Sequence, residues 1–168
     1  MRKIRSALMR YGITTWVDRF DIKTGEDYGK SIERGIEKAK NFLFFLTPTS
    51  ITSEYCLKEL DYALKSNKRI ITLKVLDMPD EDIPESIRKI QYVDFTDNDD
   101  EKEITSRNEK SDFDKDIDDL LNQFAQDEEY FAEHTRILNE AIIWDKEANE
   151  PKLLLKGYEL PMVKKWLK

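Results

Sequence analysis

The sequence Phe42-Leu-Phe-Phe-Leu46 is apolar at every position, and it is the stretch that decides the fold. A short, continuous apolar run with aromatic members is typical of a strand that is buried on both faces. Strands of this kind belong to parallel sheets, because helices cover both faces of such sheets. The run therefore predicts an α/β protein with a parallel strand, buried on both faces, at residues 42–46.

Helical and strand patterns alternate on both sides of this run. Apolar residues recur at helical spacing in residues 4–11, 32–39, 52–64 and, as a shorter piece, 83–90. Strand patterns occupy residues 13–17, 69–75 and 91–95. Strands that alternate with helices are joined by right-handed crossovers. We therefore expect a doubly wound, mostly parallel sheet with helices on both faces.

The second half of the chain changes character. Residues 97–112 are acidic and polar, which predicts a loop, and residues 113–124 form an amphipathic pattern that suits a helix covering the sheet. Two further helical patterns follow. We therefore divide the chain into a sheet domain, residues 1–126, and a helical extension, residues 127–168.

Composition excludes several classes of protein. The chain has 168 residues, and its longest apolar runs fall far short of the ~20 residues that cross a bilayer, so we expect no membrane partner. Its first ten residues lack the apolar centre of a signal peptide, which favours the cytoplasm. With 28 basic residues interspersed among 35 acidic ones, the net charge of -7 argues against nucleic acid as a partner.

Single copies of two residue types limit the chemistry. Cys56 is the one cysteine, which excludes an internal disulfide and a thiolate-rich metal site. His134 is the one histidine, which argues against Ser-His-Asp catalysis and His-rich metal sites. The chain has neither a Walker loop nor a G-x-G-x-x-G motif. We expect no metal and no resident cofactor.

Four stretches together carry a family resemblance: Gly12-Ile-Thr-Thr-Trp-Val-Asp18, Asp21-Ile-Lys-Thr-Gly25, Phe42-Leu-Phe-Phe-Leu-Thr-Pro48 and Ser53-Glu-Tyr-Cys-Leu-Lys-Glu-Leu60. In order and spacing they resemble the Toll/interleukin-1 receptor (TIR) domain of bacteria. Residues 127–168 resemble the helical extension that often follows such domains in multidomain bacterial proteins. The resemblance implies a flavodoxin-like doubly wound fold for residues 1–126 and association with other TIR domains or with itself as a homo-oligomer. In many members it also implies cleavage of NAD at the nicotinamide–ribose bond.

One departure from the family pattern concerns the start of the fold. TIR domains begin with a central strand, usually Phe-Ile-Ser-Tyr-like, whereas Met1 already falls within the first helix here. We therefore expect a TIR fold that is incomplete at its N-terminus and lacks its first strand. A misassigned start, a gene fragment and a partner that supplies the strand are the three explanations.

The resemblance also implies site residues. Glu59 matches the catalytic glutamate of the family, and Ser53, Tyr55 and Cys56 lie beside it in the motif. The remaining matches, which border the nucleotide, are Trp16, Asp18 and Gly25. NAD is then the substrate.

The proposed chemistry requires few groups. Nicotinamide in NAD is already a cation, so it leaves as a neutral ring without a general acid, whereas ordinary glycosidases need two carboxylates. One carboxylate beneath the ribose holds its hydroxyls and offsets the positive charge of an oxocarbenium-like transition state. Tyr55 and Glu59 are four residues apart, so they share one face of a helix.

Each candidate also has an ordinary structural interpretation. Glu59 is equally a solvated helix residue, Trp16 a packing residue of the sheet, and Cys56 a small buried apolar residue. Asp18 and Asp21 suit loop capping, Gly25 suits a turn and His134 suits a contact between helices. Three functions therefore remain open: an NAD-consuming signalling or defence domain, a non-catalytic TIR–TIR interaction module, and a remnant without activity of its own.

Overall fold

The computed structural model of the protein describes residues 1–17, 27–97, 111–147, 157 and 159–166. Its elements, in chain order, are α1 (Arg2–Arg10), α3 (Tyr28–Lys38), β1 (Asn41–Leu46), α4 (Glu54–Lys65), β2 (Arg69–Lys74), a 3-10 turn (Asp80–Asp82), α5 (Glu85–Arg88), β3 (Val93–Asp94), α6 (Asp112–Ala125), α7 (Glu128–Lys146) and α8 (Glu159–Trp166). None of the helices in these ranges combines the length and the apolarity that crossing a bilayer requires.

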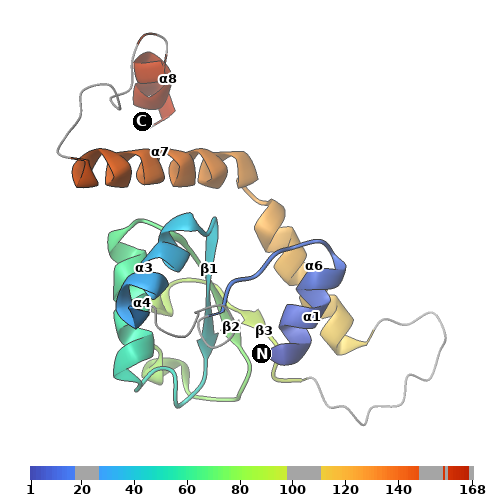
Figure 1. The fold of residues 1–168 in the computed structure, drawn as a ribbon. Coiled ribbons are helices and arrows are strands. Elements are labelled where there is room, and N and C mark those ends of the chain that lie inside the picture. The colour runs from blue at the N-terminus through green and yellow to red at the C-terminus, as the bar shows by residue number, and fades with distance from the viewer. Residues whose placement is uncertain (18–26, 98–110, 148–156, 158, 167–168) are drawn as a thin grey trace.

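The three described strands form one parallel sheet in the order β1-β2-β3 (Figure 1). Phe44 of β1 lies opposite Thr72 of β2, and Leu73 of β2 lies opposite Val93 of β3. Consecutive parallel strands require crossovers, and α4 supplies the one between β1 and β2. The expected α/β fold with an apolar parallel strand at residues 42–46 is confirmed.

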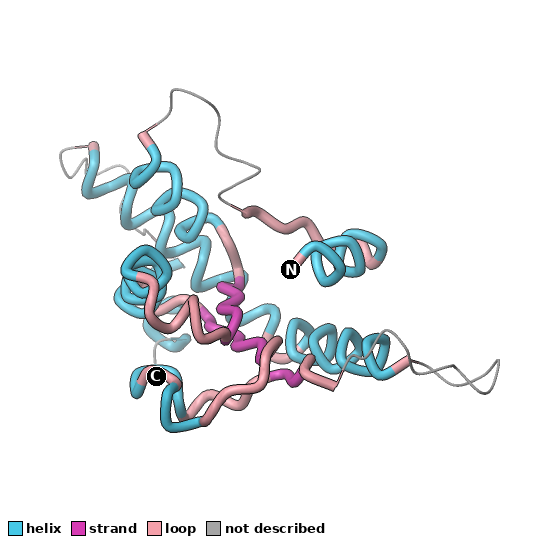
Figure 2. Tube along the Cα trace, turned by 90° about the horizontal axis from the view of Figure 1, so that it is seen from below, coloured by secondary structure: helices cyan, strands magenta, loops and turns pink. Residues whose placement is uncertain are grey.

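Two apolar clusters cover the two faces of the sheet. The first joins α1 and α6 to the side chains of β2 and β3 on one face; its largest fully buried members are Leu8, Leu73, Ile117 and Leu120. The second joins α4 and α5 to the opposite face, and includes Phe44, Leu46, Leu60 and Ile87. Figure 2 shows α1 and α6 on the same side of the strands. The sheet is therefore doubly covered, as its continuous apolar strands predict.

Residues 13–17 are not a strand of the described sheet, so this part of the sequence prediction is wrong. Gly12 adopts a φ of +76° just after α1, and the Ile13 N–H donates to the Leu8 carbonyl at 3.0 Å. β-branched residues favour a strand only where a neighbouring strand offers a ladder. No described strand pairs with this segment, so it forms no ladder.

Helix α7 crosses the amino ends of the strands and contacts α3 (Figure 1). Just before β2, the Lys68 Nζ donates to the carbonyls of Glu37 (2.7 Å) and Ala39 (2.9 Å) and contacts the Thr135 hydroxyl of α7 at 3.4 Å. The Arg69 guanidinium lies 4.7 Å from the centre of the Phe131 ring. The extension is therefore seated at the end of the sheet opposite to the loop that follows β1.

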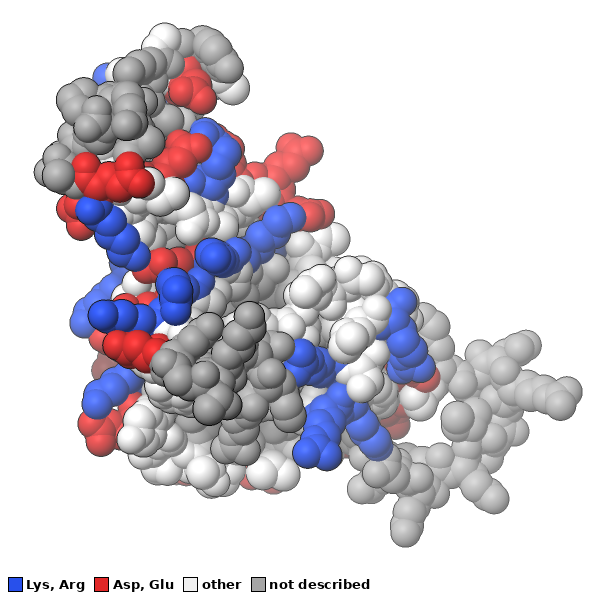
Figure 3. All heavy atoms as spheres, viewed as in Figure 1, with Lys and Arg blue, Asp and Glu red and all other residues white. Residues whose placement is uncertain are grey.

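Charged side chains are mixed over most of the face in Figure 3, with basic and acidic groups side by side along α3 and α7. Helix α1 is different. It carries Arg2, Lys3, Arg5 and Arg10 and no acidic residue, and the area over it in Figure 3 is basic. The interspersion of charges expected from the sequence therefore does not extend to α1, because the four basic residues are local in the chain and share one helix.

Candidate functional site

The loop after β1 is held by hydrogen bonds between two hydroxyl side chains and the backbone. The Thr47 N–H donates to the Ser50 Oγ and the Ser50 N–H donates to the Thr47 Oγ1, both at 3.0 Å. The Ser50 hydroxyl then donates to the Phe45 carbonyl of β1 at 2.5 Å. In open α/β sheets, ligands bind outside the carboxyl ends of the strands, which is where this loop lies. The loop thus forms a fixed floor between β1 and α4.

Ser53 begins α4 from the end of this loop. Its side chain accepts a hydrogen bond from the Cys56 N–H at 3.4 Å, which satisfies one of the free donors of the first turn. Glu54 adds a negative charge where the helix dipole favours one. The cap sets where α4 starts and hence where Glu59 lies.

Glu59 differs from the other acidic residues of α4. Glu54 and Asp61 are exposed and form ion pairs with Lys58 and Lys65, each at 2.6 Å. The hydrogen bond and the charge of Lys58 hold the pKa of Glu54 below its usual value. Glu59 is half-buried instead. It is therefore the carboxylate of this helix that is partly withdrawn from water, where its charge acts more strongly on a bound ligand.

The other two motif residues of α4 lie in contrasting surroundings. Tyr55 is 71% exposed and extends from the surface. Cys56 is half-buried with a free thiol and packs against the apolar cluster beneath α4. Its ordinary interpretation, a small packing residue, matches this position. The structure thus brings Ser53, Tyr55, Cys56 and Glu59 onto two turns of one helix, with Tyr55 on the outer side.

Trp16 packs against α3. Its ring lies so close to Gly35 that a Cβ built on that glycine falls 2.8 Å from two ring atoms. The side chain is nevertheless 41% exposed. One surface of the indole is therefore used for packing on α3, and part of the ring is open to solvent. Asp18 and Gly25, the other two residues expected at the border of the nucleotide, lie outside the described residues, as does Asp21.

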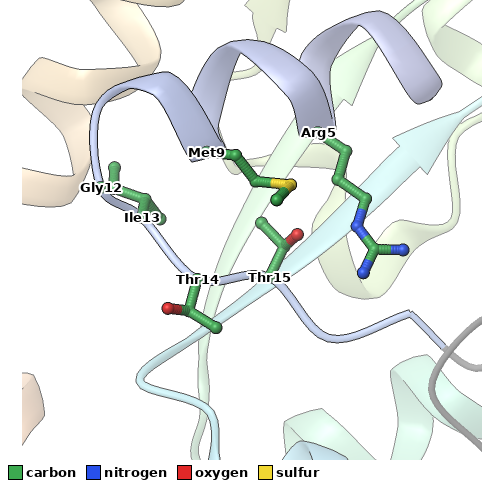
Figure 4. Close-up of a pocket in the computed structure, with 6 residues that line it drawn as sticks. All are labelled: Arg5, Met9, Gly12, Ile13, Thr14 and Thr15. Carbon is green, nitrogen blue, oxygen red and sulfur yellow. The ribbon is translucent and has the colours of Figure 1, made fainter.

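A cavity of about 270 Å³ lies between α1 and the segment that follows it (Figure 4). Its lining residues are Arg5, Met9, Gly12, Ile13, Thr14 and Thr15. None of the site residues predicted from the motif lines it. In the part of the chain that the structure describes, no three His, Cys, Asp or Glu side chains are grouped as metal ligands would be.

His134 lies on α7, at the end of the sheet opposite to the loop after β1. Burial, together with the nearby charge of Lys68, lowers the pKa of this imidazole below its usual value. It is half-buried there. This position matches the contact between helices that the sequence suggests for it.

Sequence reasoning missed the role of Thr47 and Ser50. The signal was present, because a hydroxyl residue followed three positions later by another suits reciprocal hydrogen bonding around a turn. It also missed Lys68, whose burial beneath α7 has no signature in a sequence where lysines are common.

Two of the comparisons with known proteins found a match. A family model described as "TIR domain" matches residues 1–108. Among solved structures, the TIR domain of the Toll-related receptor TRR-2 from the lower metazoan Hydra magnipapillata is similar, with 24% sequence identity and a TM-score of 0.48, covering 54% of this chain and 68% of that one. No curated protein matches. Since the family model spans more than half of its length, the chain belongs to the TIR domain family of signalling modules.

Proposed function

We propose that the protein is a TIR-domain NAD hydrolase in which Glu59 is the catalytic carboxylate. The observation that carries this proposal is the difference in burial along α4, where Glu59 is half-buried while Glu54 and Asp61 are exposed. The loop after β1 and the Ser53 cap fix the helix that bears Glu59. Ser53, Tyr55 and Cys56 surround it on α4, and Trp16, Asp18 and Gly25 complete the proposed substrate site.

The reaction balances without a general acid or a cofactor. The bond between C1′ of the ribose and the nicotinamide nitrogen breaks, its electron pair stays with the ring, and the cationic ring leaves neutral. Water adds to C1′ and releases a proton to the solvent. The Glu59 carboxylate binds the ribose hydroxyls and stabilises the positive charge that develops on the sugar. Groups of this type contribute about 10²–10³ to the rate.

Nicotinamide release from NAD by the full chain tests the proposal. We expect turnover by the wild-type protein and a loss of at least about 100-fold in the Glu59→Gln variant. NADH serves as a control substrate, because its dihydronicotinamide ring is neutral and is a poor leaving group. Absence of turnover in the wild type, or equal turnover in the variant, would refute the proposal.

A second candidate function is a non-catalytic TIR–TIR interaction module. The exposed Tyr55 at the start of α4 favours it, since exposed aromatic side chains are enriched where proteins associate. The test is the oligomeric state by analytical ultracentrifugation, with Tyr55→Ala beside the wild type. A concentration-dependent oligomer that Tyr55→Ala weakens, in a protein without NAD turnover, would favour this candidate.

We further propose the setting that the resemblance implies: a bacterial signalling or defence protein that acts in the cytoplasm as a homo-oligomer. Neighbouring copies would help to enclose NAD around Glu59.

A further inference from the structure

Glu37, near the C-terminal end of α3, is the one acidic residue that is buried among those the structure describes. A charged carboxylate is costly to bury unless it is paired or hydrogen-bonded. Its partners come from two other helices. The Tyr62 hydroxyl of α4 donates to the Glu37 Oε1 at 2.7 Å, and the Lys146 ammonium of α7 lies 3.9 Å from the same oxygen. Glu37 therefore connects α3 to both α4 and α7.

Helix α7 passes over the C-terminal end of α3 and meets it with polar groups (Figure 1). Thr135, Asn139 and Lys146 are four and seven residues apart, so they share one face of α7. The Asn139 amide contacts the Glu37 carbonyl at 3.5 Å, and the Lys68 ammonium donates to the same carbonyl at 2.7 Å. The last carbonyls of a helix have no partner within it. The seating of α7 on α3 therefore involves both the backbone and the side chain of Glu37.

Tyr62 lies on the same side of α4 as Glu59. The two residues are three positions apart, and residues at that spacing are neighbours on the surface of a helix. Both side chains are half-buried, whereas Lys58 and Asp61 between and beside them are exposed. The hydrogen bond from Tyr62 to Glu37 therefore holds against α3 the face of α4 that bears the candidate carboxylate.

We propose that Glu37 is a positioning residue, which couples the seating of α7 on α3 to the placement of Glu59 on α4. Seated α7 keeps water from the Glu37 carboxylate, and that carboxylate holds Tyr62. When α7 is displaced, water competes for the carboxylate and the hydrogen bond from Tyr62 weakens. A reacting group misplaced by about 1 Å can lose about 100-fold in rate, so α7 is a positive regulator of the site. The effect on turnover rests on the proposed NAD hydrolysis, whereas the coupling between α7 and α4 does not.

Amide hydrogen exchange of the full chain, read at single residues by NMR, tests the coupling without any activity. Asn139→Asp places a carboxylate against the Glu37 carbonyl, where the two oxygens repel, so it should displace α7 from α3. We expect the Glu59 and Tyr62 amides to exchange at least tenfold faster than in the wild type, and the Leu73 amide in the core of the sheet to be unchanged. Asn122→Asp on α6 is the matched control, because it adds the same charge at an exposed position. It should leave all three amides as in the wild type.

The route through the Tyr62 hydroxyl is tested in the same way. Tyr62→Phe keeps the ring and removes the hydrogen bond, so it should itself speed exchange at Glu59. Adding Asn139→Asp to it should then change that amide by less than twofold, since coupled changes are not additive. Three results would overturn the proposal: an unchanged Glu59 amide in Asn139→Asp, an equal acceleration at Leu73, or the same effect of Asn139→Asp with and without the hydroxyl.

Nicotinamide release by variants of the full chain tests the consequence for Glu59. Tyr62→Phe should lower kcat at least tenfold and change KM by less than threefold, because the loss falls on the transition state. Glu37→Gln should keep most of the wild-type kcat, since its amide oxygen still accepts the Tyr62 hydroxyl, whereas Glu37→Leu should resemble Tyr62→Phe. Tyr11→Phe is the control, because that tyrosine is 57% exposed, and it should match the wild type.

The turnover results separate this proposal from the proposed function. Equal turnover by Tyr62→Phe and the wild type would overturn the positioning role and leave NAD hydrolysis intact. A loss in Glu37→Gln as large as that in Glu37→Leu would also overturn it, since the hydrogen bond would then not be the cause. Absence of turnover in the wild type would refute the hydrolase, and the exchange rates would then decide the coupling by themselves.

Discussion

Ser53 links the loop after β1 to the candidate carboxylate. Its hydroxyl satisfies a backbone donor at the start of α4, six residues before Glu59. Helix ends fray when such a partner is lost, because the first N–H groups of a helix have no partner within it. The side chain that the family motif places beside the catalytic residue therefore acts through the backbone, by fixing where the helix begins.

We expect Ser53→Ala to lower the free energy of unfolding by about 1 kcal/mol, because the cap is lost. Ser53→Asp should restore most of it, since aspartate is an equally good cap. Urea unfolding measures both. Ser86→Ala on α5 is the control, since that exposed serine has no side-chain hydrogen bond to any residue that the structure describes and should change stability by less than about 0.5 kcal/mol. Equal losses at Ser53 and Ser86 would contradict the capping role.

At the scale of single elements, α3 contains two glycines with opposite constraints. A Cβ at Gly29 would meet only the Asp27 carboxylate, at an ordinary 3.6 Å, whereas a Cβ at Gly35 would lie 2.8 Å from the Trp16 ring. Glycine in a helix costs about 1 kcal/mol relative to alanine. The glycine at position 35 is therefore retained for the close approach of the indole and not for helix formation.

For the two glycines, the same substitution by alanine should change the free energy of unfolding in opposite directions. Gly29→Ala should stabilise the protein by up to about 1 kcal/mol through helix propensity. Gly35→Ala should destabilise it by about 1–3 kcal/mol through overpacking against Trp16. Urea unfolding of both variants checks the signs. In a Trp16→Ala background, Gly35→Ala should no longer lower the free energy of unfolding. A loss that persists in this background would show that Trp16 is not its cause.

Much of the element order was predictable from the sequence. The β1 run and the amphipathic α6 have strong local signals, and each lies where expected. The sequence of residues 13–17 favours a strand just as strongly, but these residues form no hydrogen-bond ladder. Strand propensity describes a single segment, whereas pairing requires a second segment beside it. The burial of Glu59 was not predictable for a similar reason. Its spacing to Tyr55 is local, but burial depends on what the folded chain packs over a side chain, and spacing within one helix does not give that.

At the scale of the whole molecule, Lys68 joins the sheet domain to α7. It is buried beneath that helix, and burial lowers its pKa to about 8, with the charge of Glu37 opposing the shift. Glu37, itself buried, accepts a hydrogen bond from Tyr62 at 2.7 Å and lies 3.9 Å from the Lys146 ammonium of α7. The extension is thus attached by polar groups more than by an apolar face.

Because the pKa of Lys68 is lowered in the folded chain, the free energy of unfolding depends on pH in a predictable direction. Between about pH 8 and 10.5 the unfolded chain holds the Lys68 proton that the folded chain has lost, so the free energy of unfolding rises with pH through this group. We expect a gain of about 1–2 kcal/mol from pH 7 to about 9.5 relative to Lys68→Met. Tyr62, whose pKa is raised by burial and Glu37, and His134, whose pKa is lowered, are present in both proteins, so the comparison with Lys68→Met isolates the effect of Lys68. Parallel pH profiles of the two proteins would show that Lys68 is solvated.

The central claim is that one half-buried carboxylate on α4 cleaves NAD. The most direct measurement is the nicotinamide turnover of Glu54→Gln divided by that of Glu59→Gln, in the full chain at equal concentration. Both variants remove one negative charge from the same helix, but Glu54 is exposed and paired with Lys58. The account predicts a ratio of at least about 100, with Glu54→Gln close to wild type. A ratio near one, or no turnover in either variant and in the wild type, would contradict it.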